Sequence, residues 1–166
     1  MIQEVKESST VSEGRKTLQY AALLLIALSW AYEGYQAFAL YRFSLLGWGY
    51  NILFVILWLW RCAFSYSDTL TPSHFIVVMF GLGMERRMSI SLKDMESFSN
   101  CYKKSFFRKT KIGTYVHRYS SLDPQPQRIL VYRKGRKLCG LLFKCSDRMI
   151  QELARRYPQQ FLDLNA

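Results

Sequence analysis

The sequence has few of the residues, and none of the local motifs, on which enzymes commonly depend. It contains two histidines, His74 and His117, and neither lies beside a serine or cysteine in a recognisable nucleophile motif. No HExxH, GxSxG, phosphate-binding loop or GxGxxG pattern occurs, and the stretch 81–83 is too short a glycine pattern to cradle a phosphate. The acidic residues are too scattered to suggest a catalytic carboxylate pair. We therefore expect a protein that is not an enzyme, with no catalytic residue and no cofactor.

The cysteines also lack the spacing of a metal or redox motif. The four are Cys62, Cys101, Cys139 and Cys145, and no two of them form a CxxC pair. In a cytosolic domain such residues are expected to be free thiols. Cys139 and Cys145 would share one face of an extended strand, so a metal site with His117 is an alternative. We favour free thiols and no metal.

Acidic residues are scarce relative to basic ones. The chain carries 23 Lys and Arg against 12 Asp and Glu, a net charge of +11. The excess is concentrated in residues 67–166, which hold 18 basic and 8 acidic residues, whereas the first seventeen residues are balanced. Anionic lipid attracts such a surface, since each nearby Lys or Arg contributes about 1 kcal/mol. Nucleic acid is the other common polyanion.

Two long apolar stretches precede this basic part, at residues 18–40 and 43–60. A helix needs about 20 mainly apolar residues to cross a bilayer, and each stretch comes close to that length. Aromatic residues gather near the ends of both stretches, as in helices that meet the headgroup layer. The sequence therefore predicts a transmembrane helical hairpin at residues 18–66, after a cytosolic tail at 1–17 and before a cytosolic domain at 67–166.

Basic residues predict the orientation of this hairpin. Arg15 and Lys16 precede the first stretch and the basic domain follows the second, whereas the connection carries only Arg42. The positive-inside rule then places both termini in the cytoplasm of a multi-pass protein of the inner (plasma) membrane.

Glu33 is the only charge inside either apolar stretch. It would lie about 22 Å along the first helix, near the outer interface. It could reach outer headgroups or bond a tyrosine or Arg42, or it could handle protons or cations, because charged residues within spans are often functional. The second interpretation gives an alternative function, a small channel or transporter subunit that works through its helices with Glu33 as the polar site. Asn51 and Gln36 could bond across the hairpin.

The sequence of the basic part predicts several strands followed by a helix. Runs rich in β-branched and aromatic residues, or flanking a tight corner, predict strands at 74–80, 84–90, 115–119, 128–133 and 137–144. Ser146 is a good N-cap, apolar residues recur from Met149 to Ala154 at helical spacing, and Pro158 ends the segment. We expect an α+β protein whose small antiparallel sheet or partial barrel is capped by a C-terminal helix.

This order resembles the bacterial pleckstrin-homology-like (PH-like) domains, including the sublancin-immunity-type and EbsA-type layouts that follow membrane helices. The resemblance rests on a strand ending in a corner at Ile90, Leu92, Asp94 and Met95, on the final hairpin through residues 134–136, and on the helix introduced by a Ser-Asp cap. It implies a binding domain, and it departs from the family pattern at residues 100–111, where the strand count is uncertain.

Two basic clusters are the candidate lipid- or partner-binding residues. The first interleaves cations with aromatic rings and comprises Lys103, Lys104, Phe106, Phe107, Arg108, Lys109 and Lys111. It predicts either contact with lipid headgroups or a solvated loop that covers the sheet, with nucleic acid the least favoured ligand. The second comprises Arg133, Lys134, Arg136 and Lys137, and by fold analogy such loops hold phosphates. We expect a membrane-anchored accessory, regulatory or immunity-type protein that binds anionic lipid headgroups, a protein partner or a second copy of itself.

Overall fold

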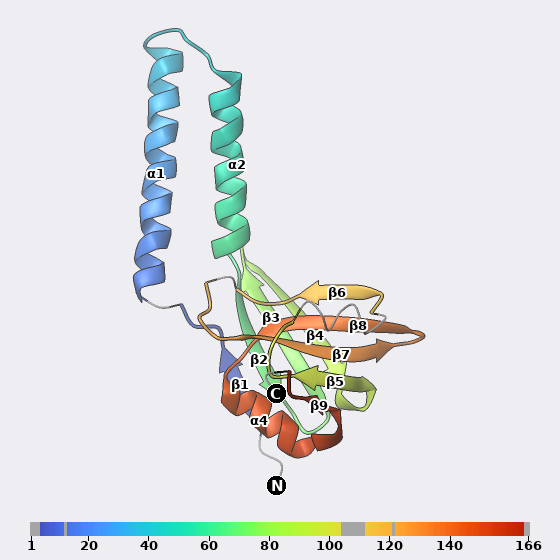
Figure 1. The fold of residues 1–166 in the computed structure, drawn as a ribbon. Coiled ribbons are helices and arrows are strands. Elements are labelled where there is room, and N and C mark those ends of the chain that lie inside the picture. The colour runs from blue at the N-terminus through green and yellow to red at the C-terminus, as the bar shows by residue number, and fades with distance from the viewer. Residues whose placement is uncertain (1–3, 12, 104–111, 121, 165–166) are drawn as a thin grey trace.

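The computed structural model describes residues 4–11, 13–103, 112–120 and 122–164, and within them the protein is α+β (Figure 1). One sheet has the strand order β1 (Val5–Ser8), β2 (Ser65–Leu70), β3 (His74–Gly81) and β4 (Met84–Ser91). The other has the order β6 (Thr114–His117), β8 (Lys137–Lys144), β7 (Gln127–Lys134), β5 (Met95–Ser99) and β9 (Phe161–Leu162). The helices are α1 (Glu13–Phe38), α2 (Leu45–Cys62) and α4 (Asp147–Arg156). Figure 1 shows α1 and α2 projecting side by side from the sheets.

Tight turns set the register of the two central hairpins. Leu82 and Gly83 join β3 to β4, and their φ values of 51° and 72° suit the two-residue turn that matches strand twist. Gly135, with φ 62°, lies in the turn that pairs Lys134 with Lys137 between β7 and β8. The predicted strands at 74–80, 84–90, 128–133 and 137–144 are confirmed to within two residues at each end.

The two sheets share one core. The chain passes from the first sheet to the second through a short 3₁₀ turn, Leu92–Asp94, and the apolar residues around this corner are buried. The ring of Phe75 in β3 meets that of Phe143 in β8, with the centroids 4.9 Å apart. The predicted corner is therefore the place where the chain changes sheets.

Helix α4 covers the open end of this core. The Ser146 side chain accepts a hydrogen bond from the Met149 N–H, as expected of an N-cap. Met149, Ile150 and Leu153 are buried in the core, and Arg155 and Arg156 occupy the last turn. The predicted helix and its cap are confirmed.

Strand β1 comes from the segment before the helices, where the sequence predicted only a tail. It pairs antiparallel with β2, and Glu7 lies opposite Asp68. The Glu7 carboxylate accepts hydrogen bonds from the Ser146 N–H (2.9 Å) and from the Ser146 hydroxyl. The start of the chain is thus attached to the first sheet and to the N-terminus of α4.

Polar contacts fix the pairing of α1 with α2. The Ser29 hydroxyl donates to Asn51 Oδ1 (2.6 Å), and Asn51 is 1% exposed. Glu33 lies against Gly47, because a Cβ at Gly47 would stand 2.2 Å from Glu33 Oε1. Asn51 therefore bonds across the hairpin as predicted, whereas Gln36 bonds Tyr32 within α1. Glu33 is half-buried between the helices.

Among the described residues, no helix is both long enough and apolar enough to cross a membrane. In α1 the 26 residues include Gln19, Ser29, Glu33 and Gln36, which lower its mean hydropathy, and α2 includes Asn51. The prediction of a transmembrane hairpin at residues 18–66 is therefore wrong. The predicted location, a multi-pass protein of the inner membrane with both termini in the cytoplasm, is wrong on the same finding.

Gly81 sets how closely the end of the helical hairpin approaches the first sheet. A Cβ at this position would lie 2.2 Å from the backbone oxygen of Ala63, just after α2. Because a backbone atom cannot rotate away, Gly81→Ala is expected to lower the free energy of unfolding by roughly 1–2 kcal/mol in urea denaturation. Gly49→Ala in α2 meets nothing within 4 Å and is the control, expected to be neutral or stabilising. Equal behaviour of the two variants would contradict the close approach.

Candidate functional site

A hollow lies where the base of the helical hairpin meets the sheets. Its volume is about 770 Å³, and we call it the junction pocket. Two lining residues come from α2. Three come from β2, from β3 and from the short segment that joins α2 to β2. The other four come from the end of β6 and the residues that follow it. The lining residues are Leu57, Trp60, Phe64, Tyr66, Met79, His117, Arg118, Tyr119 and Ser120. The walls are thus mainly apolar and aromatic.

Arg118 places a guanidinium in the junction pocket. Its backbone N–H donates to the Leu142 carbonyl of β8 (2.8 Å), which continues the pairing of β6 with β8 by one residue. Its Nη1 lies 3.8 Å from the Met79 sulfur, a weak acceptor. Burial raises the pKa of the Tyr66 phenol, and the neighbouring Arg118 guanidinium acts in the opposite direction. Arg118 is therefore half-buried beside aromatic rings, and its five N–H donors outnumber its side-chain contacts with Met79 and Tyr66 among the described residues.

Two further cations, Arg15 and Lys144, lie near the base of the hairpin. Arg15, in the first turn of α1, donates to the Leu122 carbonyl (2.6 Å), and Lys144 donates to the Asp123 carbonyl (2.6 Å). The Lys144 Nζ lies 5.5 Å from the centroid of the Tyr119 ring. Burial lowers the pKa of Lys144, Asp123 raises it and Arg15 lowers it, so Arg15 and Lys144 are near enough to repel each other.

We refer to Arg15, Arg118 and Lys144 as the junction cations. Within the described residues, none of the three has a carboxylate within salt-bridge distance. A hydrogen bond to a carbonyl or a sulfur atom does not neutralise a basic group, so its positive charge stays available to an anion. The arrangement is chemically suited to hold an anion between aromatic rings, next to an apolar helix pair.

A buried carboxyl lies in the first sheet on the same side of the fold. Asp68 is 5% exposed, and its Oδ1 has no hydrogen-bond partner in the described structure. Burial, followed by the like charges of Glu7 and Asp123, raises the pKa of Asp68 well above its usual range. Burial likewise raises the pKa of the nearby Cys145 thiol. The fold thus favours the neutral form of Asp68 more than water does.

The described part of the chain contains no grouping of His, Cys, Asp and Glu that could hold a metal ion. Cys139 and Cys145 are buried, and neither forms a disulfide. Cys145 is therefore a poorly ionised thiol inside the core, which is the opposite of a reactive or metal-binding cysteine.

The structure places the predicted binding residues away from the junction pocket or does not describe them. Arg133, Lys134, Arg136 and Lys137 are exposed at the β7–β8 tip, which points away from the hairpin base (Figure 1), and Arg133 pairs with Glu96 at 2.7 Å. Lys103 is exposed and donates to the Leu164 carbonyl. The other members of the first cluster lie outside the described residues: Lys104, Phe106, Phe107, Arg108, Lys109 and Lys111.

The sequence did not identify the junction cations as one group. Arg15 served only to predict orientation, and the segment from His117 to Tyr119 was interpreted as part of an ordinary weak strand. The sequence signal that exists is the His-Arg-Tyr run at the end of that strand, in which cationic and aromatic groups alternate.

Comparison with models of protein families, with curated proteins and with solved structures gives no match to this chain.

Proposed function

We propose that this is a non-enzymatic protein that binds anionic lipid surfaces, with the helical hairpin in contact with the lipid and the junction cations in contact with the headgroups. The observation that carries the proposal is the position of three cations that, among the residues the structure describes, have no carboxylate partner, at the base of an exposed apolar helix pair. The overall charge of +11 acts in the same direction.

The hairpin supplies the apolar part of this surface. Most of the large hydrophobic residues that the structure exposes belong to α1, α2 and their connection. Examples are Leu24 at 62%, Leu45 at 79% and Trp60 at 81% exposure. A continuous apolar surface of this kind marks a site of interaction with lipid or protein, since single scattered residues are the norm elsewhere. Cations beside it favour anionic lipid as the partner.

The globular part supports the proposal of a PH-like binding domain. Two sheets share a core, the chain turns from one to the other at a short corner, and the last long helix covers the open end between them. The resemblance implies a small antiparallel sheet or partial barrel with a helix over its open end. The covering helix agrees with it, whereas β6 and β9 pair parallel to their neighbours. The absence of any recognisable catalytic motif from the sequence supports a binding role.

Vesicle flotation of the full chain tests the proposal. Replacing Arg15, Arg118 and Lys144 together with Gln is expected to weaken binding to anionic vesicles on the order of 100-fold, since each headgroup contact contributes about 1 kcal/mol. Binding of the unaltered chain should fall as salt rises, because salt screens the attraction.

The control variant replaces Lys134, Arg136 and Lys137 with Gln, which removes the same charge from the β7–β8 tip. Its loss of binding is expected to be much smaller. Equal losses in the two variants would show only a general charge effect and would overturn the assignment to the junction. Equal binding to neutral and anionic vesicles would overturn the function itself. Circular dichroism of each variant checks that it is folded.

A further inference from the structure

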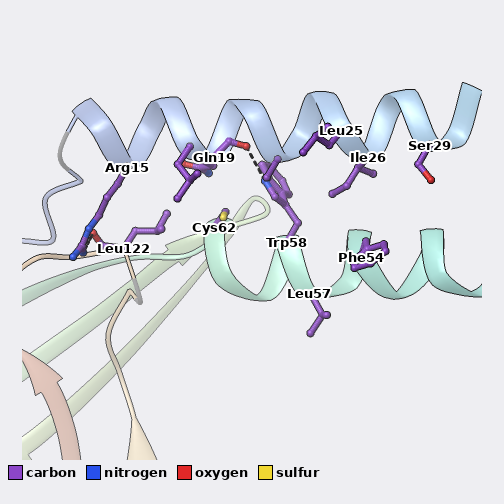
Figure 2. Close-up of a pocket in the computed structure, with 12 residues that line it drawn as sticks. Arg15, Gln19, Leu25, Ile26, Ser29, Phe54, Leu57, Trp58, Cys62 and Leu122 are labelled. Atoms are coloured by element: carbon purple, nitrogen blue, oxygen red, sulfur yellow. Dashed lines mark hydrogen bonds between the residues drawn. The ribbon is translucent and has the colours of Figure 1, made fainter.

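An elongated groove of about 680 Å³ runs between the two long helices above the junction (Figure 2). One wall comes from α1 and the other from α2, and Leu122 borders the groove at its base. Carbon lines most of it, through residues such as Ala22, Ile26, Phe54 and Trp58. Grooves of this size are within the range that holds small molecules in proteins.

The polar atoms along the groove are mostly engaged with the protein itself. The indole N–H of Trp58 donates across the groove to the Gln19 carbonyl (3.3 Å), as the dashed line in Figure 2 shows. At the far end the Ser29 hydroxyl donates to Asn51. The middle of the groove therefore offers dispersion contacts and apolar burial, and it has little to offer to a polar ligand.

The base of the groove is cationic. Arg15 lines it and uses its Nη1 for the Leu122 carbonyl, and its other N–H groups have no hydrogen-bond partner among the described residues. Lys144 is close enough to repel Arg15. An anion at this end would relieve that repulsion, and a carboxylate matches the guanidinium fork with two parallel hydrogen bonds.

The dimensions favour a chain-like ligand. Arg15 and Ser29 are fourteen residues apart on α1, which corresponds to about 21 Å along the helix. A ligand that fills this groove from its cationic base is long, narrow and apolar, with one anionic end.

We propose that the groove between α1 and α2 binds a single long-chain fatty acid, with its carboxylate at Arg15 and its hydrocarbon chain along Ala22, Ile26 and Trp58. This goes beyond the proposed function, because it concerns one lipid molecule bound from solution and needs no lipid surface. The failure of either proposal leaves the other standing.

The first measurement uses Trp58 as a reporter in the full chain, with Trp30, Trp48 and Trp60 replaced by Phe. A brominated stearic acid, added below the concentration at which it forms micelles, is expected to quench the fluorescence saturably. Quenching that grows linearly without saturation would overturn the proposal. A dimer in which Trp58 is shielded from the probe would also overturn the proposal, because a second copy of the chain would then occupy the groove.

Matched variants locate the site, with binding of radiolabelled palmitate as the measurement. Ala22→Phe fills the groove and is expected to weaken binding at least tenfold, whereas Ala21→Phe, on the neighbouring exposed position, is expected to leave it unchanged. Arg15→Gln should weaken binding about tenfold to a hundredfold, the value of charge-assisted hydrogen bonds. Lys16→Gln is its control, because Lys16 is exposed and pairs with Glu13 at 2.7 Å. Equal effects within either pair would contradict the site.

A chain-length series needs no variant and so does not depend on their folding. Affinity should rise about fourfold for each added methylene, as expected for about 0.8 kcal/mol per buried CH₂. It should stop rising once the chain fills the groove. Affinity that is independent of chain length would sink the proposal.

Discussion

Replacing Asp68 with Asn is expected to raise the free energy of unfolding at pH 8, and to change it far less at pH 4. Asp68 is 5% exposed in β2, and Glu7 lies directly opposite it in β1. The Asp123 carboxylate also acts on it with the same charge. The fold thus holds a carboxyl where its ionised form is poorly solvated and repelled.

The sign of the pH dependence follows from the direction of this shift. Burial and like charges raise the pKa of Asp68 in the folded chain above its ordinary value of 3.8, so the folded state holds the proton more tightly than the unfolded state. The resulting stability is fully present below the unfolded pKa and is lost as pH rises through the folded pKa. The other groups that face this region, Cys145 and Arg128, do not reverse that direction.

Urea denaturation at pH 4 and pH 8 measures the effect. The unaltered chain should lose stability between these values through Asp68, and Asp68→Asn should lose much less. Asp94→Asn is the control, because Asp94 is exposed in the corner between the sheets. Parallel curves for the unaltered chain and Asp68→Asn would contradict the account.

Local signals were sufficient for the strands and the helix that the sequence identified. Strands β3, β4, β7 and β8 are apolar or flank turns with positive φ, so their short-range chemistry agrees with their place in the sheets. Helix α4 has its cap, its apolar face and its terminal proline within one continuous segment. For these elements the sequence and the tertiary structure impose the same conformation.

Strands β1 and β2 lacked such signals because their partners are remote. Residues 6–8 are charged or polar, and the register pairs Glu7 with Asp68, 61 positions later. Strand β2 contains Ser67, Asp68 and Thr69, which resemble a loop in composition, yet all three are buried. Tertiary pairing decided these conformations, and no local pattern predicts it.

The candidate site was missed for the same reason. Arg15, Arg118 and Lys144 come from the start of α1, the end of β6 and the end of β8, so only the fold brings them together. The predicted clusters, by contrast, are contiguous in sequence. One lies at an exposed turn, and most of the other lies outside the described residues. In the hairpin, two apolar stretches were mistaken for membrane-spanning helices. A bond from Asn51 across the hairpin was anticipated, but its partner is Ser29, which the sequence analysis did not name, and Gln36 bonds within α1.

Replacing Phe75 with Ala is expected to lower the free energy of unfolding by about 3–5 kcal/mol, the usual cost of emptying a buried phenylalanine site. Phe75 is fully buried and contacts Phe143 of the other sheet. Phe80 lies on the same strand at 41% exposure, so Phe80→Ala is the control and should cost less than about 1 kcal/mol. Similar losses from the two variants in urea denaturation would contradict a core shared by both sheets.

The same substitution tests how far the junction pocket depends on that core. Strand β3 carries both Phe75 and Met79, and Met79 lies against Arg118 in the pocket. Phe75→Ala destabilises the strand that positions Met79. The variant is therefore expected to bind anionic vesicles normally while its sheets are folded, and to lose binding at the urea concentrations where the sheets unfold. Vesicle binding that persists after the sheets have unfolded would place the lipid contact on the helical hairpin alone and would remove the junction cations from the site.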